Sequence, residues 1–210
     1  SAMIAIINYG IGNLDSVERA FRTCKADVSV SGDPENLERA AGLVLPGVGS
    51  FGEGMQHLEE SGLVAWLNRR VREEGVPILG ICLGFQLFTK HSEEGDVDGL
   101  GWIEGETKKF RFEDGDPLLK IPHMGWNDLP TRKASPLFEG VRDDACFYFA
   151  HSYYVECDNE DAVLCTTHYG HDFVSGIALG NIYGTQFHPE KSHANGLRVV
   201  RNFIRLSEHA

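Results

Sequence analysis

Cys82 lies between Gly80 and Gly84, and this G-x-C-x-G spacing could present a nucleophile. An apolar run over 76–81 precedes the cysteine and indicates a buried strand that leads through a tight turn into a helix. This order is the cysteine form of the nucleophile elbow, a strained turn that lifts its central side chain out of the sheet. N–H groups at the helix start would stabilise a thiolate and a developing oxyanion. The alternative is an ordinary buried cysteine at a strand end.

His188 could be the base for such a thiol, and a single residue, Pro189, separates it from Glu190. Pro189 favours extended backbone at the residue before it, so the two side chains would leave the chain on the same face. The glutamate could then orient an imidazole whose other nitrogen faces Cys82, which would complete a triad. The chain order Cys, His, acid differs from the order nucleophile, acid, His of the α/β-hydrolases.

No metal and no cofactor are expected. His188 could be an ordinary loop histidine, or it could bind a metal with Glu190 and His193. The spacing H-x-E-x-x-H differs from the helical H-E-x-x-H pattern and contains a proline, which argues against a metal site. The glycines of the loop 10–12 resemble the start of a dinucleotide fingerprint, but its third glycine would fall on Asp15.

A second glycine-rich segment, Pro46-Gly47-Val48-Gly49, follows another predicted strand. Glycines around a strand end can expose backbone N–H groups, and an acyl-transfer site needs such donors for its oxyanion. A simple glycine-rich turn explains the same residues equally well.

The elements that must position these residues alternate between strand and helix over the first ninety residues. This alternation predicts an α/β fold with a mostly parallel central sheet flanked by helices. The expected strands are 3–7, 28–30, 43–45 and 76–81, and the expected helices are 14–24, one from Pro34, 53–60 and 63–74. We expect one domain over 1–210.

The second half predicts additional antiparallel strands and a last helix over 197–206. Gly180-Asn181 is a hairpin signal between the last two strands. The expected strands are 102–103, 108–112, 126–127, 146–157 as one long strand or a hairpin, 163–168, 174–179 and 182–187.

The composition excludes several classes of protein. The net charge of −12 and the absence of a basic cluster argue against a nucleic-acid partner. No apolar run is long enough to span a bilayer, and we find no signal peptide. The five cysteines include no C-x-x-C pair, which fits a reducing cytoplasm rather than a disulfide framework.

These motifs together resemble the class I, or triad-type, glutamine amidotransferases. Within that family the chain is most similar to the glutaminase subunits of imidazole glycerol phosphate synthase, an enzyme of histidine biosynthesis. The matching segments are 8–14, 46–51, 80–86, 92–95, 122–127, 151–154 and 186–192, which span the chain.

The resemblance implies a role for each matching residue. Cys82, His188 and Glu190 would form the catalytic triad, and the N–H groups of Gly49 and Leu83 the oxyanion hole, Gly49 after a peptide rearrangement. The positions that match glutamine-binding residues are Gly47, Gln86, Glu94, His151, Ser152 and Tyr153. Met124, Trp126 and Lys191 match positions at the contact with a (β/α)₈-barrel cyclase, which receives the ammonia.

Three alternatives remain. Phe85 and the segment 89–91 differ from the residues usual in this family, which favours a paralogue that supplies ammonia for cell-surface sugar synthesis. A non-catalytic binding module could keep the fold, although Cys82, His188 and Glu190 are all present. A cysteine peptidase or thiol hydrolase could use the same elbow.

Overall fold

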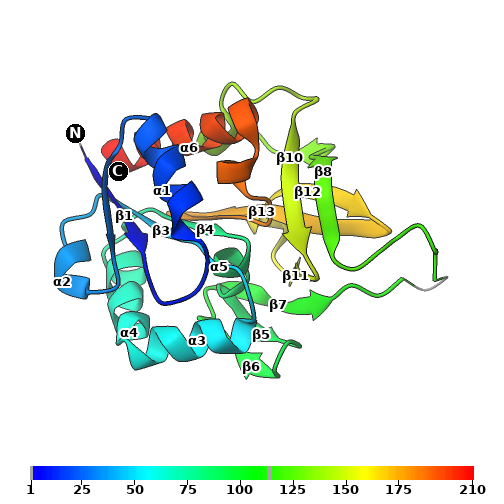
Figure 1. Cartoon of the computed structure of the whole chain (residues 1–210), viewed down its shortest axis with the longest axis horizontal. Coiled ribbons are helices and arrows are strands. Elements are labelled where there is room, and N and C mark those ends of the chain that lie inside the picture. Colours follow the sequence, from blue (N-terminus) through cyan, green and yellow to red (C-terminus); the bar gives the residue numbers. More distant parts are fainter. Residues whose placement is uncertain (1, 113–114) are drawn as a thin grey trace.

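The computed structural model describes residues 2–112 and 115–210. Its central sheet begins with five strands in the order β2 (Asp27–Ser31), β1 (Met3–Ile7), β3 (Gly42–Leu45), β4 (Ile78–Ile81) and β14 (Ile182–Thr185). All neighbours among these five strands are parallel (Figure 1). The carboxyl ends of β3, β4 and β14 therefore lie side by side at one edge of the sheet, where α/β proteins bind ligands.

Helices cover both faces of this parallel part. On one face α1 (Leu14–Thr23) and α6 (His193–Glu208) pack on the sheet, and Phe21 of α1 meets Phe203 of α6 edge to face at 6.5 Å. On the other face lie α3 (Phe51–Glu60) and α4 (Leu63–Leu67), which a π-helical turn over Asn68–Glu73 extends (Figure 1). The short helices α2 (Pro34–Leu37) and α5 (Leu83–Gln86) complete this half. The predicted α/β class is confirmed.

The sheet continues through antiparallel strands. From β14 the order is β13 (His171–Leu179), β11 (Tyr153–Cys157), β7 (Ile103–Lys109), β5 (Thr89–Ser92) and β6 (Val97–Asp98), and β12 (Val163–Tyr169) carries β9 (Thr131–Arg132) beside β13. The predicted hairpin at Gly180-Asn181 joins β13 to β14 and is confirmed. Three short 3₁₀ turns cover Pro136–Phe138, Glu160–Ala162 and Pro189–Lys191.

A separate antiparallel ribbon pairs β8 (His123–Asp128) with β10 (Cys146–His151). The expectation of one strand or hairpin over 146–157 is therefore wrong: the chain breaks at Ser152, where the His151 ring bonds the Tyr153 carbonyl, and the two halves pair in different sheets. The two short strands expected over 102–103 and 108–112 are instead one strand, β7. It runs through Gly105, where a Cβ would lie 2.0 Å from the Glu156 carbonyl oxygen of β11.

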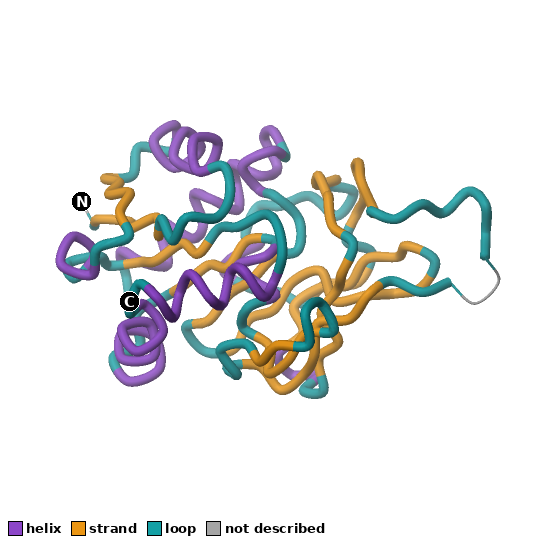
Figure 2. Tube along the Cα trace, turned by 60° about the horizontal axis from the view of Figure 1, so that its bottom comes forward, coloured by secondary structure: helices purple, strands orange, loops and turns teal. Residues whose placement is uncertain are grey.

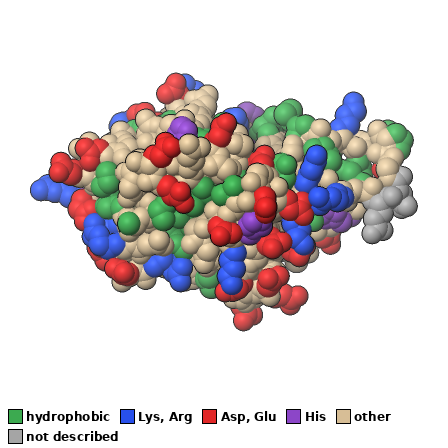
Figure 3. Space-filling model, turned by 90° about the horizontal axis from the view of Figure 1, so that it is seen from below, with side chains coloured by type: hydrophobic (Ala, Val, Ile, Leu, Met, Phe, Trp, Pro, Cys, Tyr) green, Lys and Arg blue, Asp and Glu red, His purple; other side chains and the backbone are tan. Residues whose placement is uncertain are grey.

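The helices gather at one end of the molecule and most of the strands at the other (Figure 2). Acidic and basic side chains are interspersed over the face shown in Figure 3, which carries no large basic patch. Within the described ranges, no helix is both long enough and apolar enough to cross a bilayer.

Candidate active site

Cys82 follows β4 directly and stands at the start of α5. Its backbone has φ 55° and ψ −110°, a region that non-glycine residues rarely adopt and that stores strain. A Cβ at Gly84 would lie 1.7 Å from the Leu45 carbonyl oxygen, and one at Gly80 would lie 2.7 Å from the Phe88 ring. The two glycines thus allow the close approach that the G-x-C-x-G pattern predicts.

His188 follows β14, and its backbone N–H donates to the Tyr148 carbonyl of β10 at 2.9 Å. His188 has the extended backbone that Pro189 predicts, but Glu190 lies in the 3₁₀ turn Pro189–Lys191 and not in an extended strand. The turn brings Glu190 Oε2 to 2.9 Å from His188 Nδ1. Both side chains are buried, with exposed fractions of 2% and 5%. Among the described residues, His188 Nε2 and Glu190 Oε1 have no hydrogen-bond partner.

Opposing effects set the charge of His188. Burial disfavours the imidazolium, but the charge of the nearby Cys82, followed by the hydrogen bond and charge of Glu190, outweighs it and raises the pKa of His188. With Nδ1 directed at the carboxylate, Nε2 is the atom available to the sulfur. His188 and Glu190 therefore have the geometry of a base and an orienting acid.

The turn after β3 is held in a defined conformation. The buried Tyr9 hydroxyl donates to the Pro46 carbonyl at 2.5 Å, and burial, followed by the charge of Cys82, raises the pKa of Tyr9 so that this donor keeps its proton. The backbone N–H of Leu83 donates to the Gly47 carbonyl at 3.3 Å. Gly49 has φ +111°. One of the two expected oxyanion donors is thus engaged within the protein.

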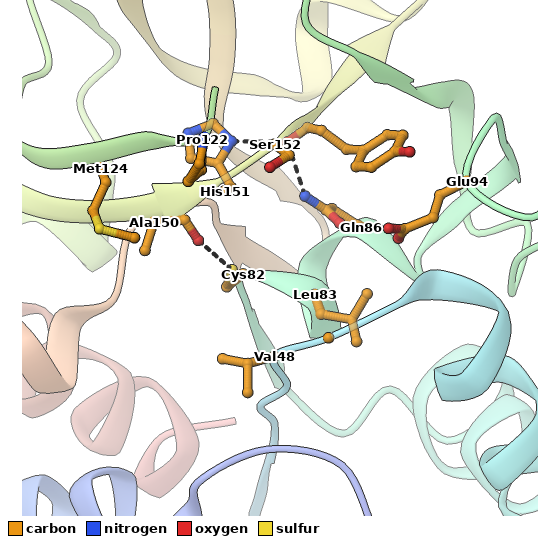
Figure 4. A pocket seen from close by; sticks show the side chains of 12 residues that line it. Val48, Cys82, Leu83, Gln86, Glu94, Pro122, Met124, Ala150, His151 and Ser152 are labelled. Atoms are coloured by element: carbon orange, nitrogen blue, oxygen red, sulfur yellow. Dashed lines mark hydrogen bonds between the residues drawn. The ribbon is translucent and has the colours of Figure 1, made fainter. Parts of the chain in front are cut away.

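A cavity of about 600 Å³, including its open mouth, lies above Cys82 (Figure 4). It is large enough for an amino acid, and it contains most of the predicted substrate residues. Its lining is formed by Val48, Gly49, Cys82, Leu83, Gln86, Glu94, Pro122, Met124, Ala150, His151, Ser152 and Tyr153. The predicted residue Gly47 lies behind this wall, where a Cβ would meet the Tyr9 hydroxyl at 2.3 Å.

The polar groups of the cavity are partly engaged with one another. Gln86 Nε2 donates to the Tyr153 carbonyl and to Gln186 Oε1, both at 3.0 Å, which leaves Gln86 Oε1 to accept from a ligand. One oxygen of Glu94 accepts from the N–H of Phe51 at the start of α3, at 2.7 Å. Its carboxylate supplies a fixed negative charge at the same wall (Figure 4).

His151 lines the cavity, but protein atoms occupy both its ring nitrogens. Nδ1 donates to the Tyr153 carbonyl at 2.8 Å, and Nε2 lies 2.9 Å from Nδ1 of His123. Burial lowers the pKa of His151 to about 3 and that of His123 to about 4, so both rings are neutral near pH 7. The ring nitrogens of this predicted substrate residue are therefore already engaged within the protein.

Three contacts of the site were not predicted. Gln186 Nε2 lies 3.6 Å from Cys82 Sγ, the Ala150 carbonyl lies 3.8 Å from the same sulfur, and His123 supports His151 from β8. The sequence held a signal for Gln186, because it lies only two residues before His188. No local pattern indicates the other two, because strand pairing brings them in.

Exposed apolar side chains line the cavity at Val48 and Met124 and continue along β8 to Trp126. Met124 and Trp126 of β8 are 63% and 50% exposed, and Val48 is 43% exposed. Trp126 stacks on His193 at 5.1 Å between ring centroids. Lys191 is exposed in the 3₁₀ turn after His188. The residues predicted for a partner contact thus lie on the surface, and one of them, Met124, also lines the cavity.

The model of the class I glutamine amidotransferase family matches residues 5–206. The chain belongs to this family. It is 49% identical over 205 residues to imidazole glycerol phosphate synthase subunit HisH 1 of Campylobacter jejuni, which covers 97% of this chain and 100% of that protein. It is 46% identical over 203 residues to subunit HisH 2 of Methanococcus maripaludis, covering 97% and 99%.

Two solved structures share the fold at low sequence identity. One described as a glutamine amidotransferase has a TM-score of 0.73 at 20% identity and covers 98% of both chains. PurLQS from Thermotoga maritima has a TM-score of 0.73 at 18% identity, also over 98% of both chains. At such identities the likeness concerns the fold alone.

Proposed function

We propose that this amidotransferase hydrolyses glutamine to glutamate and ammonia, with Cys82 as nucleophile, His188 as base and Glu190 as orienting acid. The observation that carries the proposal is the strained Cys82 elbow, which faces a cavity of amino-acid size beside the buried His188–Glu190 pair. Glutamine would lie with its side-chain amide above the sulfur. Gln86 Oε1 is free to accept from its ammonium group, and the Glu94 charge attracts that group.

The reaction proceeds in two stages. The Cys82 thiol passes its proton to His188 Nε2, the sulfur bonds to the amide carbon, and the C–N bond breaks as His188 returns the proton to the leaving ammonia. A water then attacks the thioester carbon, His188 takes its proton, and the C–S bond breaks to give glutamate and the free thiol. Glu190 keeps Nδ1 protonated throughout and stabilises the imidazolium.

The oxyanion of each stage needs donors that this conformation does not yet present. The N–H of Leu83 is bonded to the Gly47 carbonyl, and it becomes available when the turn 47–49 changes conformation. Gly49 has open space on the side where a Cβ would stand, so its peptide can reorient and add a second donor. A missing oxyanion donor costs roughly a hundredfold or more in rate, so the isolated chain is expected to hydrolyse glutamine slowly.

We further propose that the partner is a (β/α)₈-barrel cyclase and that the ammonia passes to it for imidazole glycerol phosphate synthesis in the histidine pathway. Support comes from the HisH subunits, which are 46–49% identical along nearly the whole chain. Further support comes from the exposed apolar residues Val48 and Met124, which line the cavity, and Trp126, which follows Met124 by two residues on β8. The alternative is a synthase of cell-surface sugars, which Phe85 and the segment 89–91 favour.

The test of the chemistry is ammonia release from glutamine by Cys82→Ala and by Cys146→Ala, in which an exposed thiol is removed as the matched control. We expect loss of activity in the first variant, with unchanged fold, and normal activity in the second. Near-normal turnover by Cys82→Ala would rule out the proposed nucleophile. Hydrolysis of peptides without ammonia release from glutamine would favour a peptidase.

The test of the partner is glutaminase turnover in the presence of each candidate barrel protein. We expect the histidine-pathway cyclase to bind and to accelerate turnover at least a hundredfold. If only a surface-sugar synthase accelerates turnover, the assignment to the histidine pathway is wrong, while the proposed glutamine hydrolysis stands. Equal rates for the isolated chain and the complex would contradict the proposal that the turn 47–49 must change conformation before the Leu83 N–H can bind the oxyanion.

A further inference from the structure

A continuous series of hydrogen bonds connects strand β8 to the sulfur of Cys82. The Tyr153 carbonyl lies within this series and determines which group donates and which accepts at each contact. The Tyr153 carbonyl can only accept, so His151 Nδ1 carries the proton at the 2.8 Å contact. A neutral imidazole has one N–H, so His151 Nε2 accepts from His123 Nδ1 at 2.9 Å. His123 Nε2 then accepts from the Asn127 amide at 3.3 Å. Each tautomer follows from the one before it.

The same carbonyl orients the amides on the other side. Gln86 Nε2 uses one hydrogen on the Tyr153 carbonyl and the other on Gln186 Oε1, each at 3.0 Å. The opposite orientation of the Gln186 amide would set two N–H donors against each other. Gln186 is fully buried, and its Nε2 is therefore directed at Cys82 Sγ at 3.6 Å.

The two neighbours of the sulfur favour different protonation states. The Ala150 carbonyl, at 3.8 Å, can only accept and suits the S–H of the thiol. The Gln186 amide at this position can only donate and suits the thiolate, which is the nucleophilic form. The orientation of one buried amide thus biases the sulfur toward reactivity.

We propose that the Gln186 amide acts directly on Cys82 as a donor to its sulfur, and that Gln86, itself oriented by the Tyr153 carbonyl, fixes this amide. The hydrogen bonds from Asn127 through His123 and His151 hold that carbonyl in place. The proposal deepens the proposed function, because it rests on Cys82 as the nucleophile. Asn127 lies on β8, the strand that bears Met124 and Trp126. The position of this partner-facing strand therefore bears on the orientation of the donor.

The experiment measures alkylation of Cys82 by iodoacetamide against pH, in the full chain, with the modified cysteine identified by mass spectrometry. Gln186→Glu keeps the shape but directs a carboxylate at the sulfur, and Gln186→Met keeps a similar volume without a donor. We expect the glutamate variant to shift the half-maximal rate upward by at least one pH unit, which slows alkylation near pH 7 about tenfold. The methionine variant should shift it in the same direction by less.

The role of the hydrogen bonds from β8 is tested with Asn127→Leu, which removes the donor to His123. Asp128→Ala, at the neighbouring exposed position, is the matched control. We expect a twofold to fivefold slower alkylation in the first variant and the wild-type pH profile in the second. Equal profiles for these two variants would overturn the role assigned to the hydrogen bonds from β8.

An unchanged pH profile in a folded Gln186→Glu chain would overturn the role of Gln186. If that variant does not fold, Gln186→Met decides, and an unchanged profile again overturns it. These failures differ from failure of the proposed function, which would appear as a wild-type chain that releases no ammonia from glutamine, alone or with a barrel partner.

Discussion

At the scale of single residues, the Glu190 carboxylate has two effects on His188: it accepts from Nδ1 and it stabilises the imidazolium. Glu190→Gln keeps the shape and removes the charge. We expect glutamine hydrolysis to fall roughly 10²–10⁴-fold, as when a triad acid becomes an amide, and the pKa of His188 to fall with it. Steady-state kinetics and the histidine NMR signals against pH measure the two effects.

The chain offers a matched control for this change. His168 and Asp172 form the same kind of pair at 2.8 Å, but both are exposed. Asp172→Asn is expected to leave turnover unchanged, because water replaces the lost interaction. Equal losses in both variants would mean that the Glu190 charge acts no differently from a surface carboxylate.

His123 and His151 predict a sensitivity to acid. Burial lowers both pKa values, to about 4 and about 3, so between those values and about pH 6.5 the unfolded chain binds more protons than the folded one. The stability that depends on these two neutral histidines is therefore fully present above pH 6.5 and is lost as the pH falls toward 4. We expect urea unfolding to show stability falling by on the order of 1 kcal/mol per histidine for each pH unit in this window.

A His123→Gln variant isolates this effect from the titration of carboxylates. It should start less stable at pH 7 and lose less stability between pH 6.5 and 5 than the wild type does. An identical loss in both proteins would mean that the buried histidines do not drive the acid response.

At the scale of elements, the elbow and the turn after β3 depend on glycine for different reasons. Gly84→Ala would bring a Cβ within 1.7 Å of the Leu45 carbonyl oxygen, whereas Gly49→Ala meets no atom within 4 Å and carries only the strain of φ +111°. We expect Gly84→Ala to unfold the chain or destabilise it by more than about 4 kcal/mol. Gly49→Ala should remain folded at a cost of about 1–3 kcal/mol.

Denaturant titration of the two variants checks this prediction, with each glycine serving as the control for the other. Similar losses would show that the strand and helix can separate at the elbow without disturbing the fold. A folded Gly49→Ala chain also reports on the turn, since its ammonia release should fall if the Gly49 peptide must reorient.

At the scale of the whole molecule, the exposed apolar residues around the cavity mouth predict where a partner binds. Buried aromatic residues contribute most to interfaces, so Trp126→Ala is expected to weaken binding of the proposed barrel partner at least tenfold, about 1.4 kcal/mol. Arg39→Ala, an exposed position beside α2 at the far side of the molecule, is the control. Calorimetric titration with the barrel protein measures both, and equal affinities would place the interface elsewhere.

The sequence by itself determined the elements whose signals are local. Gly80, Cys82 and Gly84 predicted a strained turn because only the absence of a Cβ permits that backbone approach. The proline and the two-residue spacing indicated that His188 and Glu190 would meet, although a 3₁₀ turn rather than extended backbone joins them. The hairpin at Gly180-Asn181 followed from turn chemistry. Alternation of strands and helices was enough to predict the α/β class.

Only the tertiary structure decided how these parts meet. The strand order places β4 between β3 and β14, so residues far apart in the chain share one edge of the sheet. The break at Ser152 sends β10 and β11 into different sheets, and this brings the Ala150 carbonyl to the sulfur and His123 to His151. Such contacts depend on backbone carbonyls and on pairing between distant strands. Neither a residue type nor a spacing along the chain predicts such contacts.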